Sequence, residues 1–182
     1  MRKINFKYLF ILASLAALSC QRDDICSESI ETTPLLIIRF YDIDEPEVLK
    51  APQNLSIRSV DSDSTDFVVN TGGANPVTYF RYSQDSIAIP LKTKENETQY
   101  VFTLNTEADD NTATNTGLRD TISFTYGLEE EYINRACAYK ISYVGLKEDI
   151  SSGTNGASWI EDIQILELNV EDQNQAHVSI FF

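Results

Sequence analysis

The chain has 182 residues, with 14 Lys and Arg against 28 Asp and Glu and a formal net charge of −14. Its length suits one domain with a sizeable hydrophobic core. An acidic surface repels the phosphates of nucleic acids and anionic lipid headgroups, so nucleic acid is excluded as a partner and charge alone does not draw the chain to a membrane.

The N-terminal residues predict an export signal. Arg2, Lys3 and Lys7 precede an apolar run over 8–18, which is the order of a secretory signal peptide. The run is shorter than the roughly 20 apolar residues of a membrane-spanning helix. We therefore assign residues 1–19 to a signal peptide, 20–33 to a tether and 34–182 to the folded domain.

The end of this signal resembles the lipobox of bacterial lipoproteins, with Ala17-Leu18-Ser19 directly before Cys20. The resemblance implies that Cys20 receives a lipid and becomes the first residue of the mature chain. The membrane is then reached through the anchor on Cys20. Loss of Arg2, Lys3 and Lys7 leaves 11 basic against 28 acidic residues, a mature charge of −17.

Beyond the tether, apolar and polar residues alternate in short runs separated by turn residues. A period of two with aromatic and β-branched residues predicts β-strands. In chain order, the expected strands are Leu35–Tyr41, Leu55–Val60, Phe67–Asn70, Val77–Tyr82, Ser86–Leu91, Tyr100–Leu104, Ile122–Tyr126, Cys137–Tyr143, Trp159–Val170 and Val178–Phe182. The phase slips within Trp159–Val170, which predicts a β-bulge near Ile165.

Two polar stretches, 107–117 and 151–156, predict loops, and no helical period is sustained. The expected fold is therefore all-β, a single antiparallel β-sandwich domain. The closing residues Val178, Ile180 and Phe182 resemble the terminal strand of outer-membrane barrels, which keeps a small outer-membrane β-barrel as a minor alternative.

The cysteines predict one cross-link. If Cys20 carries lipid, Cys26 and Cys137 remain as an even pair in an oxidising compartment, as a disulfide requires. Chain-entropy models give a loop of about a hundred residues a stabilisation of about 4–5 kcal/mol. The alternative is a buried free thiol at Cys137 and an exposed one at Cys26.

Metal-ligand patterns are weak in this chain. Asp61, Asp63 and Asp66 could offer oxygen ligands to Ca²⁺. An EF-hand loop counted from Asp61, however, needs Gly and Glu where Asp66 and Gly72 stand. A single histidine also disfavours a zinc site. We predict no metal and no cofactor.

Catalytic patterns are equally weak. Cys137 and His177 form the Cys–His pair available for nucleophilic catalysis, but each fits a strand position. We therefore predict no catalytic residue and a chain that is not an enzyme. An envelope hydrolase using carboxylates, which so acidic a sequence cannot single out, is the alternative.

The residues after the signal resemble the export tag of Bacteroidota surface lipoproteins, with Arg22 replacing the usual Lys in Cys20-Gln21-Arg22-Asp23-Asp24. Further segments resemble an uncharacterised Bacteroidota lipoprotein family of unknown function, across nearly the whole mature chain. These segments are Arg22–Cys26, Thr32–Asp42, Ile87–Leu91, Ala136–Lys140, Trp159–Ile160 and His177–Val178. The resemblance implies no activity, and it associates Cys26 with Cys137. Asp85-Ser86-Ile87 and Asp120-Thr121-Ile122 also resemble the O-glycosylation sequon of this phylum, which makes Ser86 and Thr121 candidate sites.

Taken together, the sequence predicts a cell-envelope lipoprotein, lipid-anchored in the outer membrane on its periplasmic or surface-exposed face. Its body is expected to be a non-enzymatic module that binds or scaffolds a protein or glycan partner.

The anchor is directly testable. Cys20→Ala removes the sulfur that would carry the lipid, so we expect the variant to move from the detergent phase to the aqueous phase on phase partitioning. Labelling by a fatty-acid analogue should also disappear. Unchanged labelling of the variant would refute acylation at Cys20.

Overall fold

The computed structural model describes residues 26, 32–61, 67–70, 76–107, 117–152 and 158–182, so the predictions for the signal peptide, Cys20, Asp63 and Asp66 lie outside the described residues. Within these ranges the chain forms strands and no helix, which confirms the all-β prediction. The strands are β1 Leu36–Tyr41, β2 Ser56–Ser59, β3 Val69–Asn70, β4 Val77–Thr78, β5 Ser86–Ile89, β6 Glu97–Leu104, β7 Leu118–Asn134, β8 Ala138–Ser152, β9 Asp162–Ile165 and β10 Val178–Phe181.

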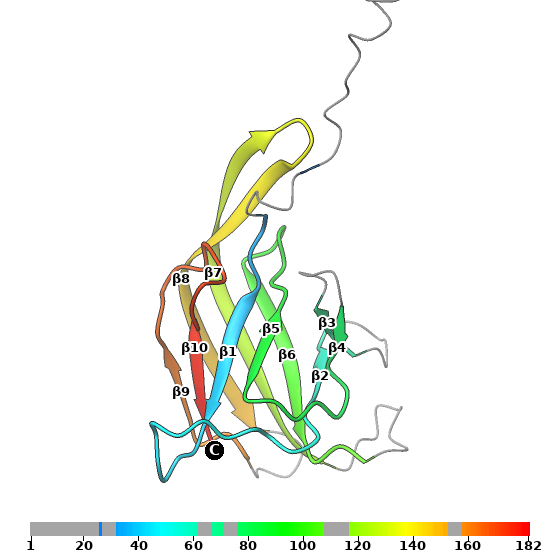
Figure 1. The fold of residues 1–182 in the computed structure, drawn as a ribbon, viewed down its shortest axis with the longest axis vertical. Coiled ribbons are helices and arrows are strands. Elements are labelled where there is room, and N and C mark those ends of the chain that lie inside the picture. The colour runs from blue at the N-terminus through cyan, green and yellow to red at the C-terminus, as the bar shows by residue number, and fades with distance from the viewer. Residues whose placement is uncertain (1–25, 27–31, 62–66, 71–75, 108–116, 153–157) are drawn as a thin grey trace, which may run out of the picture.

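Two four-stranded sheets carry most of the fold (Figure 1). The first has the order β5-β1-β10-β9 and the second the order β2-β6-β7-β8, while β3 and β4 form a small hairpin beside β2. Neither order closes on itself. The expected antiparallel pairing holds except between β1 and β10, which run parallel from Ile38↔Val178 to Tyr41↔Phe181. Parallel neighbours need a long connection, and these two strands come from opposite ends of the domain.

Both sheets contribute to one hydrophobic core, which follows from the alternation in the sequence. Leu36, Ile38 and Phe40 of β1 point inward and are fully buried, as are Ile122 and Phe124 of β7. Side chains of alternate residues leave opposite faces of a strand, so one apolar face per strand is enough to build this core. The central strand β10 is buried over its whole length, as expected for a strand with neighbours on both sides and cover on both faces.

The prediction of one continuous strand over Trp159–Val170 is wrong, whereas a two-against-one irregularity of the kind predicted does lie next to Ile165. Strand β9 ends at Ile165, where the N–H groups of Leu166 and Glu167 both donate to the carbonyl of His177. The chain then crosses to the second sheet, where Leu168 and Val170 hydrogen-bond to the backbone of β8. The phase slip in the sequence therefore marks a bulge-like pair, Leu166 and Glu167 opposite His177, followed by a change of sheet that leaves Leu168 exposed.

Strands β7 and β8 are much longer than predicted and form a projecting hairpin. We call its outer part the arm, which comprises Gly127–Asn134, the turn 135–137 and Ala138–Val144. Figure 1 shows the arm rising from one end of the body, opposite the C-terminus. The sequence did not predict this extension, because the acidic run 129–131 lacks the apolar alternation of a strand. The predicted loop over 151–156 starts too early, because β8 continues to Ser152; residues 153–156 lie outside the described residues.

A β-bulge marks the base of the arm. Between the pairs Thr125↔Lys147 and Gly127↔Val144, strand β7 has one residue, whereas β8 has Gly145 and Leu146. Gly145 has φ +65°, a left-handed conformation that glycine adopts at little steric cost. A bulge increases the local twist of a hairpin, so it re-aims the arm relative to the sheet.

Three buried tyrosines hold the connection between the two sheets. Tyr100 of β6, Tyr126 of β7 and Tyr143 of β8 donate their hydroxyl protons to the carbonyls of Pro90, Lys92 and Leu91, respectively. These carbonyls are consecutive in the segment that leaves β5 in the first sheet and enters β6 in the second. We call this arrangement the tyrosine cluster. Burial raises the pKa of each of its three hydroxyls above the usual value of about 10.

The tyrosine cluster generates a stability prediction. Tyr143→Phe keeps the ring but leaves the buried Leu91 carbonyl without its donor, so we expect a loss of about 1–3 kcal/mol in the free energy of unfolding. Exposed Tyr132→Phe is the matched control and should change it by less than about 0.5 kcal/mol.

The pH dependence has a defined sign. The pKa values of the Tyr100 and Tyr143 hydroxyls in the folded state lie above the unfolded value of about 10. The stabilisation that these hydroxyls give is therefore complete below pH 10 and is lost as the pH rises further. Denaturant unfolding of both variants at neutral and alkaline pH measures these effects. Equal midpoints for Tyr143→Phe and the wild type would contradict the assigned role.

Candidate functional site

The arm is fastened to the N-terminal segment at two points. Cys26 and Cys137 form a disulfide with their Cα atoms 4.7 Å apart, across 111 positions of sequence. Further along β8, the N–H of Ile141 donates to the Oγ1 of Thr33 at 3.0 Å. The structure thus brings together the two cysteines that the sequence paired, and it places them at the tip of the arm. The chain that precedes Cys26 therefore starts from the tip.

The tip is shaped by its own side chains. Asn134 accepts hydrogen bonds on its Oδ1 from the N–H groups of Ala136 and Cys137, at 2.9 and 2.8 Å. This local bonding closes the turn between β7 and β8, as Asn commonly does. Two aromatic side chains stand beside it: Tyr132 and Tyr139 are 55% and 59% exposed and pack edge-to-face with ring centroids 5.3 Å apart. This pair was not predicted from the sequence, where the only signal was two tyrosines on either side of Cys137.

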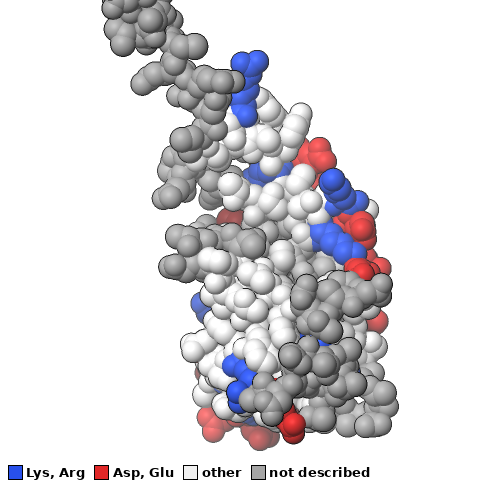
Figure 2. Space-filling view, turned by 90° about the vertical axis from the view of Figure 1, so that its right-hand side faces the viewer, with Lys and Arg blue, Asp and Glu red and all other residues white. Residues whose placement is uncertain are grey.

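Charge is distributed unevenly along the arm. Residues 132–140 contain Arg135 and Lys140 and no acid, whereas 129–131 are three consecutive glutamates. Figure 2 shows a basic side chain at the narrow upper end of the molecule, and both basic and acidic side chains below it and toward the opposite end. Lys140 is buried, so the tip presents one exposed basic side chain, Arg135, beside two exposed tyrosines, on a chain whose overall charge is strongly negative.

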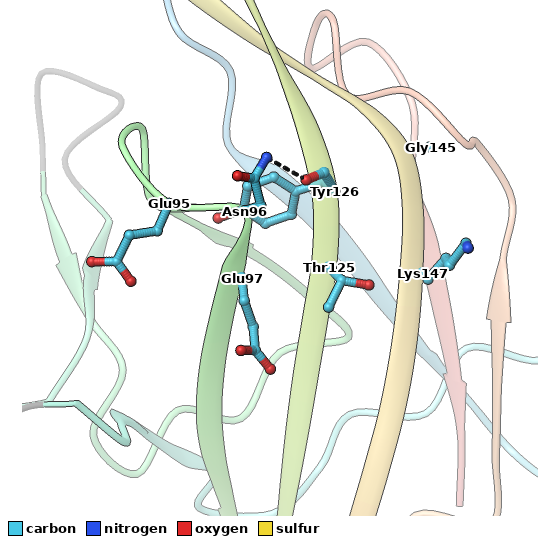
Figure 3. A pocket seen from close by; sticks show the side chains of 7 residues that line it. All are labelled: Glu95, Asn96, Glu97, Thr125, Tyr126, Gly145 and Lys147. Carbon is cyan, nitrogen blue, oxygen red and sulfur yellow. Dashed lines mark hydrogen bonds between the residues drawn. The ribbon is translucent and has the colours of Figure 1, made fainter.

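A shallow basin of about 730 Å³ lies at the base of the arm (Figure 3). It is lined by Glu95, Asn96, Glu97, Thr125, Tyr126, Gly145 and Lys147. The Nδ2 of Asn96 donates to the carbonyl of Tyr126 at 3.0 Å, which joins the β5–β6 connection to the bulge. The basin is wide and carries charges of both signs, so it suits contact with a macromolecule better than enclosure of a small substrate.

An acidic hollow of about 260 Å³ lies between β8 and β9. It is lined by Glu148, Asp149, Glu161 and Asp162 together with three isoleucines. In the part of the chain that the structure describes, no three His, Cys, Asp or Glu side chains are grouped so that they could hold a metal ion. Asp61, one of the three aspartates considered for calcium, forms an ion pair with Lys92.

The two candidate glycosylation triplets differ in their setting. Ser86 opens β5 and is half-buried, whereas Thr121 lies within β7, paired with Val101 and Ser151. The aspartate that precedes Thr121 is fully buried: the Oδ2 of Asp120 accepts hydrogen bonds from the N–H groups of Trp159 and Ile160 at 2.9 and 3.0 Å. Asp120 therefore anchors the chain where it approaches β9. Its position in phase with the apolar Ile122 was the signal that could have revealed this role.

His177 and Cys137 have separate structural roles. The Nδ1 of buried His177 accepts a hydrogen bond from the backbone N–H of Ile37 at 3.0 Å, and the backbone N–H of His177 donates to the Ile37 carbonyl at 2.9 Å. The side chain thus joins β1 to the start of β10. Burial lowers the pKa of this imidazole, although interactions with Asp172 and Glu167 act in the opposite direction. Cys137 is bonded to Cys26 in the arm.

The comparison with protein families decides what this chain is related to. The model of a family of unknown function, DUF6452, matches residues 54–182. The chain belongs to this family. The DUF6452 match includes Ile87–Leu91 and Ala136–Lys140 of the resembling segments, but it begins after Cys26 and β1. Comparison with curated proteins and with solved structures gives no match.

Across the described residues, there is no helix with the length and apolar character needed to span a membrane.

The cross-link predicts a measurable contribution to stability. We expect Cys26→Ser and Cys137→Ser each to lower the free energy of unfolding by about 2–4 kcal/mol, because the cross-link that closes the long loop no longer restricts the unfolded chain. The double variant should lose about as much as either single variant. Peptide mapping without reduction should recover the two cysteines in one cross-linked species; recovery of both as alkylated thiols would contradict the bond.

Because of His177, we expect the free energy of unfolding to decrease in acid. Because its folded-state pKa lies below the unfolded value of about 6.5, the unfolded chain takes up a proton that the folded chain does not, and stability falls as the pH drops below 6.5. His177→Asn keeps an acceptor near the Nδ1 position, whereas His177→Leu leaves the Ile37 N–H unpaired and should cost about 1–3 kcal/mol.

Denaturant unfolding between pH 5 and 8 measures the effect, and both variants should lose the acid-dependent part. We also expect His177→Gln to leave any envelope phenotype intact at normal protein level. A specific loss of activity with an unchanged fold would instead assign His177 to catalysis.

Proposed function

We propose that this member of DUF6452 is an outer-membrane lipoprotein whose body is a non-enzymatic binding or scaffolding module. In this proposal, the signal at 1–19 is removed, Cys20 carries the lipid, and the two sheets of 34–182 form one sandwich domain. Placement among Bacteroidota envelope proteins is part of the same proposal and is supported by the tag-like residues after Cys20.

One observation carries the proposal: the arm is covalently joined to the segment that leads to Cys20. A flexible tether alone would leave the body free to turn in any direction. The Cys26–Cys137 disulfide and the Thr33–Ile141 hydrogen bond instead join the N-terminal segment to an extension of the second sheet at two points. Such an attachment presents the body in a restricted orientation, which is useful to a protein that positions a partner.

The basin at the base of the arm is the surface that we assign to the partner. It lies on strands β6, β7 and β8, beside the bulge from which the arm departs. Its lining mixes Glu95 and Glu97 with Lys147 and polar groups. A surface of this mixed kind can bind a protein or glycan through apolar contact at its centre and hydrogen bonds at its rim.

Photo-cross-linking in the intact envelope tests this proposal. A photoreactive amino acid at exposed Thr125, in the basin, should give a discrete cross-linked species, whereas the same residue at exposed Gln164 of β9 should not. Two results would contradict a binding module. One is the absence of any light-dependent species at Thr125. The other is an enzymatic activity that is abolished in the Glu161→Gln, Asp162→Asn double variant, whose changes lie in the acidic hollow.

A further inference from the structure

The length of the tether limits where the arm tip can lie. Cys26 follows Cys20 by six residues, and an extended chain covers at most about 3.3–3.6 Å per residue, or roughly 20 Å over this stretch. Cys137 is joined to Cys26 with 4.7 Å between their Cα atoms. If Cys20 is acylated, as the proposed function has it, the tip is therefore held within roughly 25 Å of the lipid anchor.

The shape of the molecule decides which part faces the membrane. The arm spans seven residue steps from Gly127 to Asn134, which corresponds to about 23 Å at the rise of a β-strand. The disulfide sits at its outer end, and the C-terminus lies at the opposite end of the molecule (Figure 1). The part of the described chain that is joined closest to the anchor is thus the tip, while the acidic body stands behind it.

The chemistry of the tip suits a bilayer surface. Tyr132 and Tyr139 are more than half exposed, and tyrosine places an apolar ring and a polar hydroxyl at the level of lipid headgroups. Exposed Arg135 lies in the turn between them and can bind lipid phosphate through its guanidinium group. Glu129–Glu131 follow immediately on the body side, where repulsion from anionic lipids limits how deeply the arm can enter.

From the tether length, the shape and this charge boundary we infer that the arm tip contacts the headgroup region of the membrane that holds the lipid anchor. In this arrangement Tyr132 and Tyr139 lie at the bilayer interface and Arg135 binds phosphate. The arm then acts as a spacer that holds the acidic body, and the basin at its base, away from the lipid surface. A contact at the tip would orient the body and add to the retention that the lipid on Cys20 supplies.

Depth-dependent fluorescence quenching tests this inference on the full-length lipidated protein. Tyr139→Trp places a reporter at the tip, Tyr132→Trp gives an independent reporter on the facing strand, and Leu168→Trp, at a position 65% exposed on the body, is the control. The native Trp159 is buried in all three. Each variant is reconstituted in vesicles of phosphatidylcholine with a minority of phosphatidylglycerol, in which the acyl chains are brominated near their carbonyl ends.

We expect both tip reporters to be quenched at least about twofold more than the Leu168→Trp reporter and to shift to shorter emission wavelength. Adding Arg135→Glu to Tyr139→Trp should reduce the quenching, because the new carboxylate is repelled by phosphate. Vesicle flotation is measured on the same samples. Failure to float would refute the anchor and this inference together.

Flotation with equal quenching at tip and body would overturn the inference while leaving the lipoprotein assignment in place. A response of the tip reporters to native envelope membranes, without one to pure lipid vesicles, would also overturn it, because the tip would then bind a protein.

Discussion

The structure depends on how the chain passes from the first sheet to the second at Pro90–Lys92. A polypeptide that leaves one sheet and enters another carries backbone carbonyls with no neighbouring strand to satisfy them, and burial makes each unmade hydrogen bond costly. Here each of three strands of the second sheet supplies one tyrosine hydroxyl to one of three consecutive carbonyls. The same rings belong to the core, so the tyrosine cluster links the packing of the sheets to the path of the chain. Tyr79 extends this pattern by exchanging two hydrogen bonds with the backbone of Ala88 in β5.

The arm is joined to this cluster at its base. Tyr126 lies at the bulge where the arm begins, and Tyr143 occupies the facing strand, with their rings 4.9 Å apart. The outer edge of β8 is covered in turn by Thr33, Val170 and Leu168, which reduces the unpaired backbone that an edge strand offers to other chains. The arm is therefore continuous with the second sheet at its base and bonded to the N-terminal segment at its tip. Both attachments restrict the orientation of the arm relative to Cys26 and Thr33.

The buried polar residues serve the same purpose as the tyrosines. Asp120 binds the N–H groups of Trp159 and Ile160 where the chain approaches β9, and His177 binds the backbone of Ile37 where β10 begins beside β1. Each lies where a segment joins a sheet and leaves backbone groups without ladder partners. Residue types that usually suggest catalysis are thus engaged here in completing backbone hydrogen bonds.

Much of this fold could be read from the sequence because strand alternation is a local property. The apolar phase of Leu35–Tyr41 or Val178–Phe182 reflects which face is buried, and that requirement is the same whichever strand lies alongside. The cysteine count likewise narrowed the cross-link to Cys26 and Cys137 without reference to geometry.

The pairing of strands and the route of the chain between the sheets could not be predicted in this way, because both depend on residues far apart in the chain. Nothing local in β1 and β10 distinguishes parallel from antiparallel pairing, and the slip near Ile165 has the same pattern whether the strand bulges or leaves its sheet. The extension of the β7–β8 hairpin through Glu129–Glu131 also could not be predicted from the sequence, since a two-stranded arm in solvent has no buried face that would require apolar and polar residues to alternate. Tertiary structure decided that the cross-link sits at the end of this arm, and so which end of an acidic body is held nearest to Cys20.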